Sequence, residues 1–374
     1  MLWGPFPHEG GVFGGGIGGY ARCNSQMLRS RLSRAVTLRR LPMTVPRFHG
    51  RILAALHLVP RLLADCLALL VTLLRDRPDV LHITALYWRS IYREAYAVAL
   101  CRLLGVQVIY DLRAGTFIDY AESRGPFGTA LLRLIMSLST EVTVEGKKYV
   151  EYVERKFGRT PTWIPNFVLD ADLSSFPPAE LRQPGPDEPF RIAFTGYLIP
   201  DKGVDVLLRA AHHLSRRFPV ELTLIGEQSD RIGEELERFR TLQSNSFRLV
   251  TPGRLELPEV LSTLREQHVF VFLSRFHGEG HSNAVSEAMA MGLPVVASRH
   301  GFLADVVTDE CGVVLSDPRD AVAVTEVLWE LRSDWDRLRR LGRSARERIR
   351  TEFGEGPVLG KTEALYQRCA RRAA

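Results

Sequence analysis

The chain has 374 residues, of which 45% are hydrophobic and 25% charged. A prior of roughly 150 residues per domain predicts two or three domains, and the ordinary use of 30 glycines and 21 prolines excludes a collagen-like or low-complexity chain. Its five cysteines lie far apart and form no C-x-x-C pair. A zinc knuckle or thioredoxin motif is therefore excluded, and a reducing compartment is favoured.

The positive charge is concentrated in the first half of the chain. Residues 1–180 hold 22 Lys and Arg against 15 Asp and Glu, whereas the remainder holds 27 against 28. This surplus suits anionic partners such as phosphates or acidic lipid, with a merely solvated basic surface as the open alternative. We expect no nucleic-acid partner.

The most apolar stretch, Ile52 to Leu74, is long enough to cross a bilayer. It contains Pro60, Arg61 and Asp65, and charges at membrane depth are costly. We therefore expect a buried or surface-lying helix. Because the first residues lack a secretory signal, we expect a cytoplasmic protein, with the inner face of the membrane as a further option.

In the first half, short apolar runs alternate with helical patterns. This alternation predicts parallel strands joined by right-handed βαβ units. The expected strands are Val80–Ile83, Val106–Tyr110 and Glu141–Val144, and the helix Ile91–Leu104 stops at Gly105.

A proline-rich segment separates the two halves. Five prolines in residues 177–189 can continue neither a helix nor an inner strand. We therefore expect domains at 1–168 and 190–350, a linker at 169–189, and a helix within 351–374 that packs back on the first domain. In the second half we expect the strands Phe190–Phe194, Glu221–Ile225, Val269–Leu273 and Val295–Ala297, and the helix Val204–Phe218.

A glycine-rich loop lies near the start of the chain. Gly14, Gly16 and Gly19 satisfy G-x-G-x-x-G, but the acid that a dinucleotide site needs is missing, since Arg39 and Arg40 stand where it is expected. A glycine loop that opens a helix can still bring backbone N–H groups to an anion. A mobile loop without a ligand is the alternative.

Two segments follow strands of the second half, where ligands of such sheets bind. In the first, Gly196 allows close approach of the backbone, and Lys202 stands just before a helix and can neutralise a phosphate. In the second, Glu279 lies in a turn, and Glu287 lies eight residues later in about the first turn of the next helix. Carboxylates suit hydroxyl groups, and the N–H groups of Gly280 to Asn283 suit a diphosphate or a sugar.

Residues 273–297 closely resemble the E-x7-E signature of retaining nucleotide-sugar glycosyltransferases of the GT-B fold, glycosyltransferase family 4. Phe194 to Gly203 resembles the G-R-x-x-x-x-K-G loop of that family, Trp163 to Phe167 its I-P-N segment, and Gly14 to Tyr20 its G-G loop. The resemblance implies two Rossmann-like α/β domains whose parallel sheets face an interdomain cleft.

The resemblance also implies roles for single residues. Glu287 would bind the ribose diol, Glu279 the transferred sugar, and Lys202 with the backbone near Gly196 the diphosphate. Further contacts with the donor would come from Gly280, His281, Ser282 and Asn283, and from Gly15 and Gly16 in the first domain.

The sequence departs from the family at two places. Tyr197 replaces an arginine beside Gly196, and the sequence around Arg113 replaces a histidine–glycine pair. Arg113 is therefore a candidate for contact with phosphate or sugar, and a structural pair with Asp111 is the alternative.

The function implied is transfer of a sugar with retention, from a nucleotide diphosphosugar, to a glycan or lipid-linked acceptor in cell-surface polysaccharide or glycolipid synthesis. The nucleotide of the donor is UDP or GDP, and UDP is favoured. We expect neither a cofactor nor a metal, because the two D-x-D sequences, Asp170–Asp172 and Asp334–Asp336, lie in the linker and in a helix. The basic first domain suggests peripheral membrane contact. The alternatives are a nucleotide-sugar epimerase of the same fold and a non-catalytic nucleotide-sugar-binding protein.

Overall fold

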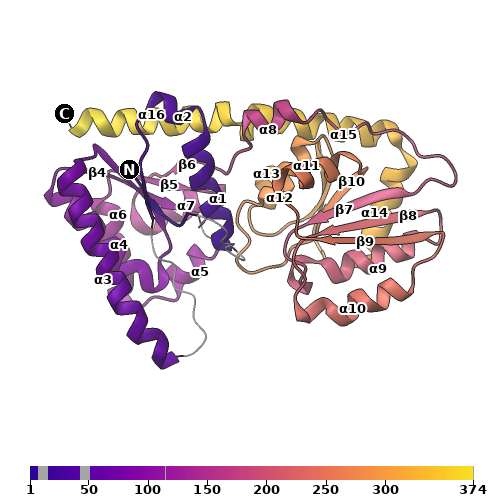
Figure 1. Ribbon diagram of the computed structural model, residues 1–374, viewed down its shortest axis with the longest axis horizontal. Coiled ribbons are helices and arrows are strands. Elements are labelled where there is room, and N and C mark those ends of the chain that lie inside the picture. The colour runs from indigo at the N-terminus through magenta and orange to yellow at the C-terminus, as the bar shows by residue number, and fades with distance from the viewer. Residues whose placement is uncertain (7–15, 43–50, 114, 374) are drawn as a thin grey trace. The chain divides into compact units, whose positions relative to one another are not determined.

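The computed structural model describes residues 1–6, 16–42, 51–113 and 115–373, with backbone only at 16–20, 51–59, 89 and 373. The chain forms two compact units. The first consists of Met1–Asn166 and Val358–Ala374, and the second of Phe167–Pro357 (Figure 1).

The first unit is built on a six-stranded parallel sheet whose four inner strands are almost entirely buried and whose two edge strands are more exposed. Apolar runs such as Val80–Ala85 fit a sheet that is covered on both faces. In spatial order the strands are β2 (Arg40–Pro42), β1 (Leu2–Gly4), β3 (Val80–Ala85), β4 (Gln107–Leu112), β5 (Glu141–Val144) and β6 (Thr162–Trp163).

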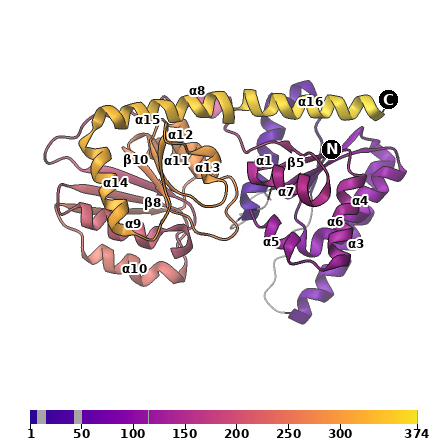
Figure 2. The same ribbon diagram turned by 180° about the vertical axis from the view of Figure 1, so that it is seen from behind.

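Helices connect and cover these strands (Figure 2). One of them shows how the sequence sets its bounds: α7 buries Tyr149, Tyr152, Val153 and Phe157 and ends at Gly158, whose φ of 66° is the left-handed conformation that favours glycine. The helices are α1 (Gly16–Arg29), α2 (Leu32–Ala35), α3 (Arg51–Asp76), η1 (Trp88–Ser90), α4 (Ile91–Leu103), α5 (Phe117–Glu122), α6 (Pro126–Leu138), α7 (Lys147–Phe157) and α16 (Glu355–Ala373).

The second unit has a parallel six-stranded sheet of its own. Its strands are, in spatial order, β12 (Gly312–Leu315), β11 (Val295–Ser298), β10 (Val269–Phe272), β7 (Phe190–Thr195), β8 (Val220–Ile225) and β9 (Phe247–Gly253). Its helices are α8 (Asp170–Ser175), η2 (Pro200–Lys202), α9 (Val204–Leu214), α10 (Asp230–Thr241), α11 (Leu257–Arg265), α12 (Asn283–Ala290), α13 (Leu303–Val306), α14 (Ala321–Ser333), α15 (Trp335–Arg348) and the π-helix η3 (Ile349–Phe353).

The two parallel α/β units confirm the fold class predicted from the sequence. The proline-rich segment, however, belongs to the second unit instead of joining two independent bodies. The Arg346 side chain on α15 donates to the carbonyl oxygens of Leu173 and Phe176, and the Ala179 N–H donates to Met291. These bonds satisfy backbone groups that prolines prevent from joining a helix or a sheet.

The C-terminal helix α16 changes unit along its length. From Val358 onward it is part of the first unit, where the Tyr366 hydroxyl lies 2.6 Å from His82 Nδ1 on β3. The predicted helix at 52–74 is α3, and in the part of the chain that the structure describes no helix is long and apolar enough to cross a membrane.

His268 is a buried imidazole in the core of the second unit. It stacks on Phe190, and its Nδ1 accepts the Arg191 backbone N–H at 2.9 Å. Burial first, then the positive charges of Arg191 and Arg332, lower its pKa to about 4 from an ordinary value of 6.5. Between about pH 6.5 and pH 4 the unfolded chain therefore binds a proton at His268 that the folded chain does not bind. The free energy of unfolding therefore decreases as the pH is lowered through this range.

We expect this group alone to cost the protein about 2.5 kcal/mol of unfolding free energy at pH 4.5 relative to neutral pH. The measurement is urea unfolding at both pH values for the parent and for His268→Gln, which cannot titrate. The variant should lose less stability on acidification by this amount, and equal losses would contradict the assignment.

Candidate functional site

The loops after β7 and β8 touch at the carboxyl end of the second sheet. Gly196 and Gly226 have φ values of 144° and 147°, and a Cβ on Gly226 would lie 1.8 Å from the Gly196 carbonyl oxygen. Only glycine permits so close an approach of two backbones. The loop that carries Lys202 is thereby held against its neighbour.

A second close approach brings the Lys202 loop to the end of β10. Gly203 has a φ of 79°, and a Cβ there would lie 2.5 Å from the Leu273 carbonyl oxygen. In the same way Gly301 lies against Glu279, whose carbonyl oxygen would be 2.4 Å from a Cβ at that position. Glycines in three loops thus allow the turn with Glu279 to lie beside Lys202.

Lys202 and Glu279 form a direct ion pair. Lys202 Nζ lies 2.6 Å from Glu279 Oε2, and the Ser274 hydroxyl donates to the same oxygen. The ammonium also lies 5.4 Å and 5.0 Å from the ring centres of Phe272 and Phe276. A cation and a carboxylate in such partly apolar surroundings interact more strongly than in water.

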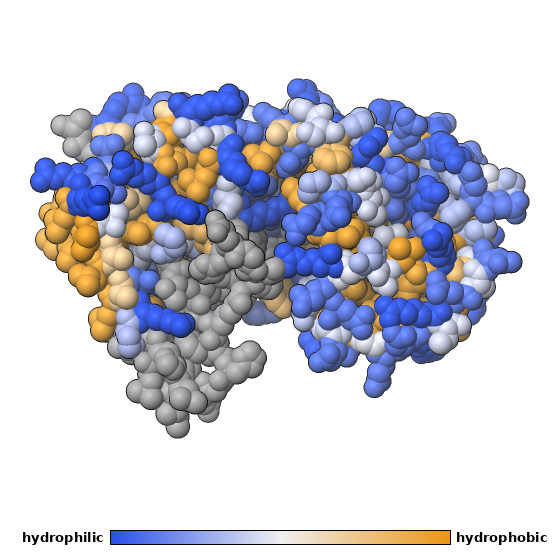
Figure 3. All heavy atoms as spheres, viewed as in Figure 1, coloured by the Kyte–Doolittle hydropathy of each residue, from blue (hydrophilic) through white to orange (hydrophobic). Residues whose placement is uncertain are grey.

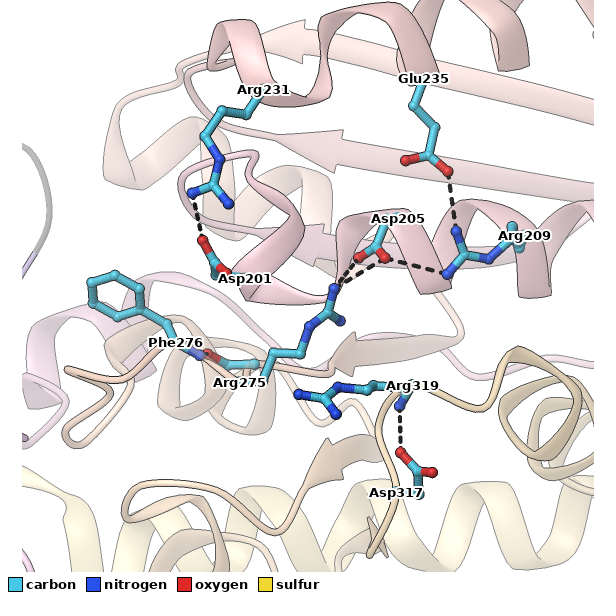
Figure 4. Close-up of polar contacts among 10 residues, drawn as sticks. Asp201, Asp205, Arg209, Arg231, Glu235, Arg275, Phe276, Asp317 and Arg319 are labelled. Atoms are coloured by element: carbon cyan, nitrogen blue, oxygen red, sulfur yellow. Dashed lines mark hydrogen bonds and ion pairs between the residues drawn. The ribbon is translucent and has the colours of Figure 1, made fainter.

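Arg275 connects the loop after β10 to the residues around Lys202 through Asp201 and Asp205 (Figure 4). Its backbone N–H donates to the Asp201 carbonyl at 2.8 Å, and its guanidinium contacts both carboxylate oxygens of Asp205 at 2.9 and 3.0 Å. Asp205 in turn accepts from Arg209, which also bonds Glu235 on α10. Arg275, which follows Ser274 in the chain, therefore bonds both Asp201 before Lys202 and Asp205 after it.

The remaining predicted residues of this unit lie in the turn before α12 and in that helix. His281 is buried, with Nε2 2.8 Å from the Ser286 hydroxyl and its ring against Phe353. Glu287 is also buried, and it is the fifth residue of α12, close to the first turn in which it was predicted. Gly280 precedes these residues, Ser282 is the N-cap of α12, and Asn283 is its first residue.

Three further predicted site residues, Gly15, Gly16 and Arg113, belong to the first unit. Gly15 lies outside the described residues, and Gly16 is the first residue of α1. Arg113 follows β4 and is only 2% exposed. Its Nε donates to Asp111, and its Nη1 donates to Asn166 Oδ1 at 2.8 Å.

Asp111 is the centre of a buried polar network. It accepts from the Thr143 hydroxyl at 2.6 Å and lies 3.3 Å from His82 Nε2. Burial alone raises its pKa, but Arg113, His82 and Thr143 outweigh burial and hold the pKa well below the ordinary value. Its stabilising effect is present above about pH 4, the ordinary Asp value, and is lost as the pH falls further. The structure thus gives Arg113 a structural partner, and its contact with a donor stays a prediction.

Sequence reasoning missed Ser274, Arg275 and Gly301. Ser274 was visible only as the residue at which a predicted strand ends. No pattern in the sequence marks Arg275, because its partner Asp205 is 70 residues away in the chain. Gly301 lies after β11, where a glycine is compatible with any tight turn.

Comparisons with known proteins indicate what the chain is similar to. Residues 189–334 match the family described as "Glycosyl transferases group 1", and this range contains Lys202, Glu279 and Glu287. This part of the second unit is therefore similar to glycosyl transferases of group 1, in agreement with the glycosyltransferase resemblance stated from the sequence.

Curated relatives match chiefly over part of their length. The chain is 30% identical over 168 residues to a GDP-mannose-dependent monoacylated alpha-(1-6)-phosphatidylinositol monomannoside mannosyltransferase of Corynebacterium glutamicum, covering 43% of each protein. It is 33% identical over 185 residues to an MMP alpha-(1->4)-mannosyltransferase of Mycolicibacterium hassiacum, covering 49% of this chain and 44% of the relative. The chain thus spans less than half the length of these two relatives.

Solved structures share the fold over nearly the whole chain. A sucrose-phosphate synthase from Thermosynechococcus elongatus has a TM-score of 0.72 at 20% identity and 98% coverage of both chains. HepE of Anabaena, crystallised with UDP-glucose, has a TM-score of 0.64 at 15% identity, covering 98% of this chain and 99% of the other. These likenesses establish the fold.

Proposed function

We propose that this protein is a family 4 glycosyltransferase that moves a sugar, with retention of anomeric configuration, from a nucleotide diphosphosugar to a glycan or lipid-linked acceptor. The observation that carries the proposal is the Lys202–Glu279 pair, held by Ser274 at the carboxyl end of the second sheet. It lies in the domain that matches the family, at the edge where parallel α/β sheets bind ligands.

In the proposed reaction the bond from the anomeric carbon to the diphosphate breaks, and the acceptor oxygen bonds to the same face of that carbon. The leaving diphosphate accepts the acceptor proton. Lys202 stabilises the growing negative charge on the diphosphate. Glu279 holds hydroxyls of the transferred sugar, and Glu287 holds the ribose diol, with N–H groups of Gly280 to Asn283 as further donors.

The donor base is part of the proposal. We favour UDP over GDP as the donor nucleotide. HepE was crystallised with UDP-glucose, whereas the corynebacterial relative is named for GDP-mannose. We further propose action in the cytoplasm, without a metal or another cofactor, in cell-surface polysaccharide or glycolipid synthesis.

The test has two stages. A thermal-shift screen of UDP, GDP, ADP and their sugars should identify one base by a concentration-dependent rise in melting temperature. Transfer to glycan and lipid-linked acceptors is then followed by NMR with a chelator present, and the product should keep the anomeric configuration of the donor. An inverted product or dependence on metal would overturn the mechanism. An epimerised donor without acceptor, or binding without turnover, would overturn the proposed activity.

A further inference from the structure

The first unit carries an exposed apolar surface on three adjacent helices. In the described residues α3 packs against α4, and α4 packs against α6, and all three lie together in Figure 2. We call the surface the α3–α4–α6 face. Its members, all but Tyr96 more than half exposed, are Leu63, Leu67, Val71 and Leu74 on α3, Tyr92, Tyr96 and Leu103 on α4, and Phe127 and Leu134 on α6.

The spacing of these residues places them on one side of each helix. Leu63, Leu67, Val71 and Leu74 follow one another at steps of four, four and three, which is the period of a helix stripe. Figure 3 shows apolar residues gathered at the edge of the first unit where α3 and α4 lie in Figure 1. An apolar surface that continues over three helices exceeds the scattered exposure that is usual on a soluble domain.

Within the described side chains of these three helices, the exposed charges have one sign. The exposed ionised residues in the described side chains of the three helices are arginines: Arg61, Arg75, Arg102 and Arg133. The acidic residues described on the same helices already have partners in the protein. Asp65 pairs with Arg93, Asp76 pairs with Arg39, and Glu94 is fully buried and bonded to the Tyr110 hydroxyl.

A second copy of the chain fits this pattern poorly. In a two-fold dimer the face would meet itself, so that the exposed arginines of these helices would face one another, with no exposed acid among the described side chains of the same helices to pair with them. A bilayer with acidic headgroups supplies both the apolar interior and the negative charge. Trp88, which is 54% exposed, lies in η1 just before α4, and Trp and Tyr are enriched at membrane–water interfaces.

We propose that the α3–α4–α6 face docks the protein on a membrane that contains anionic lipid. The apolar side chains enter the boundary of headgroups and acyl chains, and the surrounding arginines contact lipid phosphates. The inference stands apart from the proposed sugar transfer, because it rests on a surface of the first unit that contains none of the proposed donor residues.

Vesicle co-sedimentation of the full chain, without donor, tests the proposal. The probes are vesicles of phosphatidylcholine alone and of phosphatidylcholine with phosphatidylglycerol. We expect the parent to bind the anionic vesicles more tightly, and added salt to weaken this binding. The triple variant Leu67→Gln/Leu103→Gln/Phe127→Gln should lose at least about tenfold in partition, since each change removes an apolar side chain from one helix.

Two further variants separate the contributions. Arg75→Gln/Arg102→Gln should weaken binding to anionic vesicles by about 25-fold at low salt, at roughly fivefold for each arginine, and leave binding to neutral vesicles unchanged. Val322→Gln, a matched control at an exposed position of α14 in the second unit, should bind like the parent. Unchanged melting temperatures verify folding.

The proposal is overturned if the parent fails to bind anionic vesicles, or if the triple variant binds as well as the parent. A dimer of the parent that the triple variant abolishes, without vesicle binding, would assign the face to a second copy. Failure of the proposed sugar transfer is read separately, from the donor screen, and leaves this outcome unaffected.

Discussion

Replacing Lys202 by methionine is expected to reduce kcat/KM for sugar transfer by about 10²–10³-fold, the usual loss when one group that stabilises developing negative charge is removed. Methionine keeps most of the side-chain length but not the charge. The ammonium lies 2.6 Å from Glu279 and near two aromatic rings, so the substitution leaves this place without the charge that Lys202 supplies. Steady-state kinetics with the donor identified by thermal shift measure the loss.

Two companion variants make this result specific. Glu279→Gln should also lower kcat/KM, because the neutral amide can no longer pair with Lys202 or accept two charge-assisted bonds from sugar hydroxyls. Arg217→Met removes a cation of the same unit that pairs with Glu326 on the exposed surface, and it should be as active as the parent. If Lys202→Met and Glu279→Gln both retain parental activity, the site has been assigned to the wrong residues.

Arginine is not expected to rescue Lys202. The pair depends on a compact ammonium that meets a single carboxylate oxygen already shared with Ser274. A planar guanidinium spreads its charge and needs more room. Lys202→Arg should therefore recover only a minor part of the lost activity, which distinguishes precise placement from a simple need for positive charge.

Much of this site followed from the sequence because its residues stand in a short, patterned stretch. Strand Glu141–Val144 was predicted with its observed bounds, and Glu279 and Glu287 were found from the turn and helix that separate them. The direct contact of Lys202 with Glu279 could not be predicted. It links residues 77 positions apart and depends on β10 lying beside β7, an order that periodicity does not encode.

The short edge strands and the proline-rich segment show a second limit. β1 and β2 have three residues each, too few for a periodic signal. Prolines correctly excluded regular structure at 177–189, but they do not reveal whether a segment is free or packed. Here the guanidinium of Arg346 binds the carbonyl oxygens of Leu173 and Phe176 just before that segment, and the Ala179 N–H within it donates to the Met291 carbonyl oxygen, so the segment is attached to the second unit.

The second large effect is expected at Arg113. Arg113→Met removes the guanidinium that neutralises Asp111 in a fully buried position. Breaking a buried pair by removing one partner leaves an uncompensated charge, and we expect the first unit to lose about 3–5 kcal/mol of unfolding free energy. Chemical unfolding at neutral pH measures the loss, and Arg155→Met, at an exposed position of α7, is the matched control and should change stability by less than about 0.5 kcal/mol.

A double variant separates a structural role for Arg113 from contact with a donor. In Arg113→Met/Asp111→Asn neither charge remains, and the amide can still bond the Thr143 hydroxyl, so we expect most of the lost stability to return. Because Asp111 and Asn166 already engage the guanidinium, we expect transfer activity to return with stability. A double variant that is stable but remains at least about tenfold less active would instead give Arg113 a direct role at the substrate, as expected if it takes the place of the histidine–glycine pair of the family.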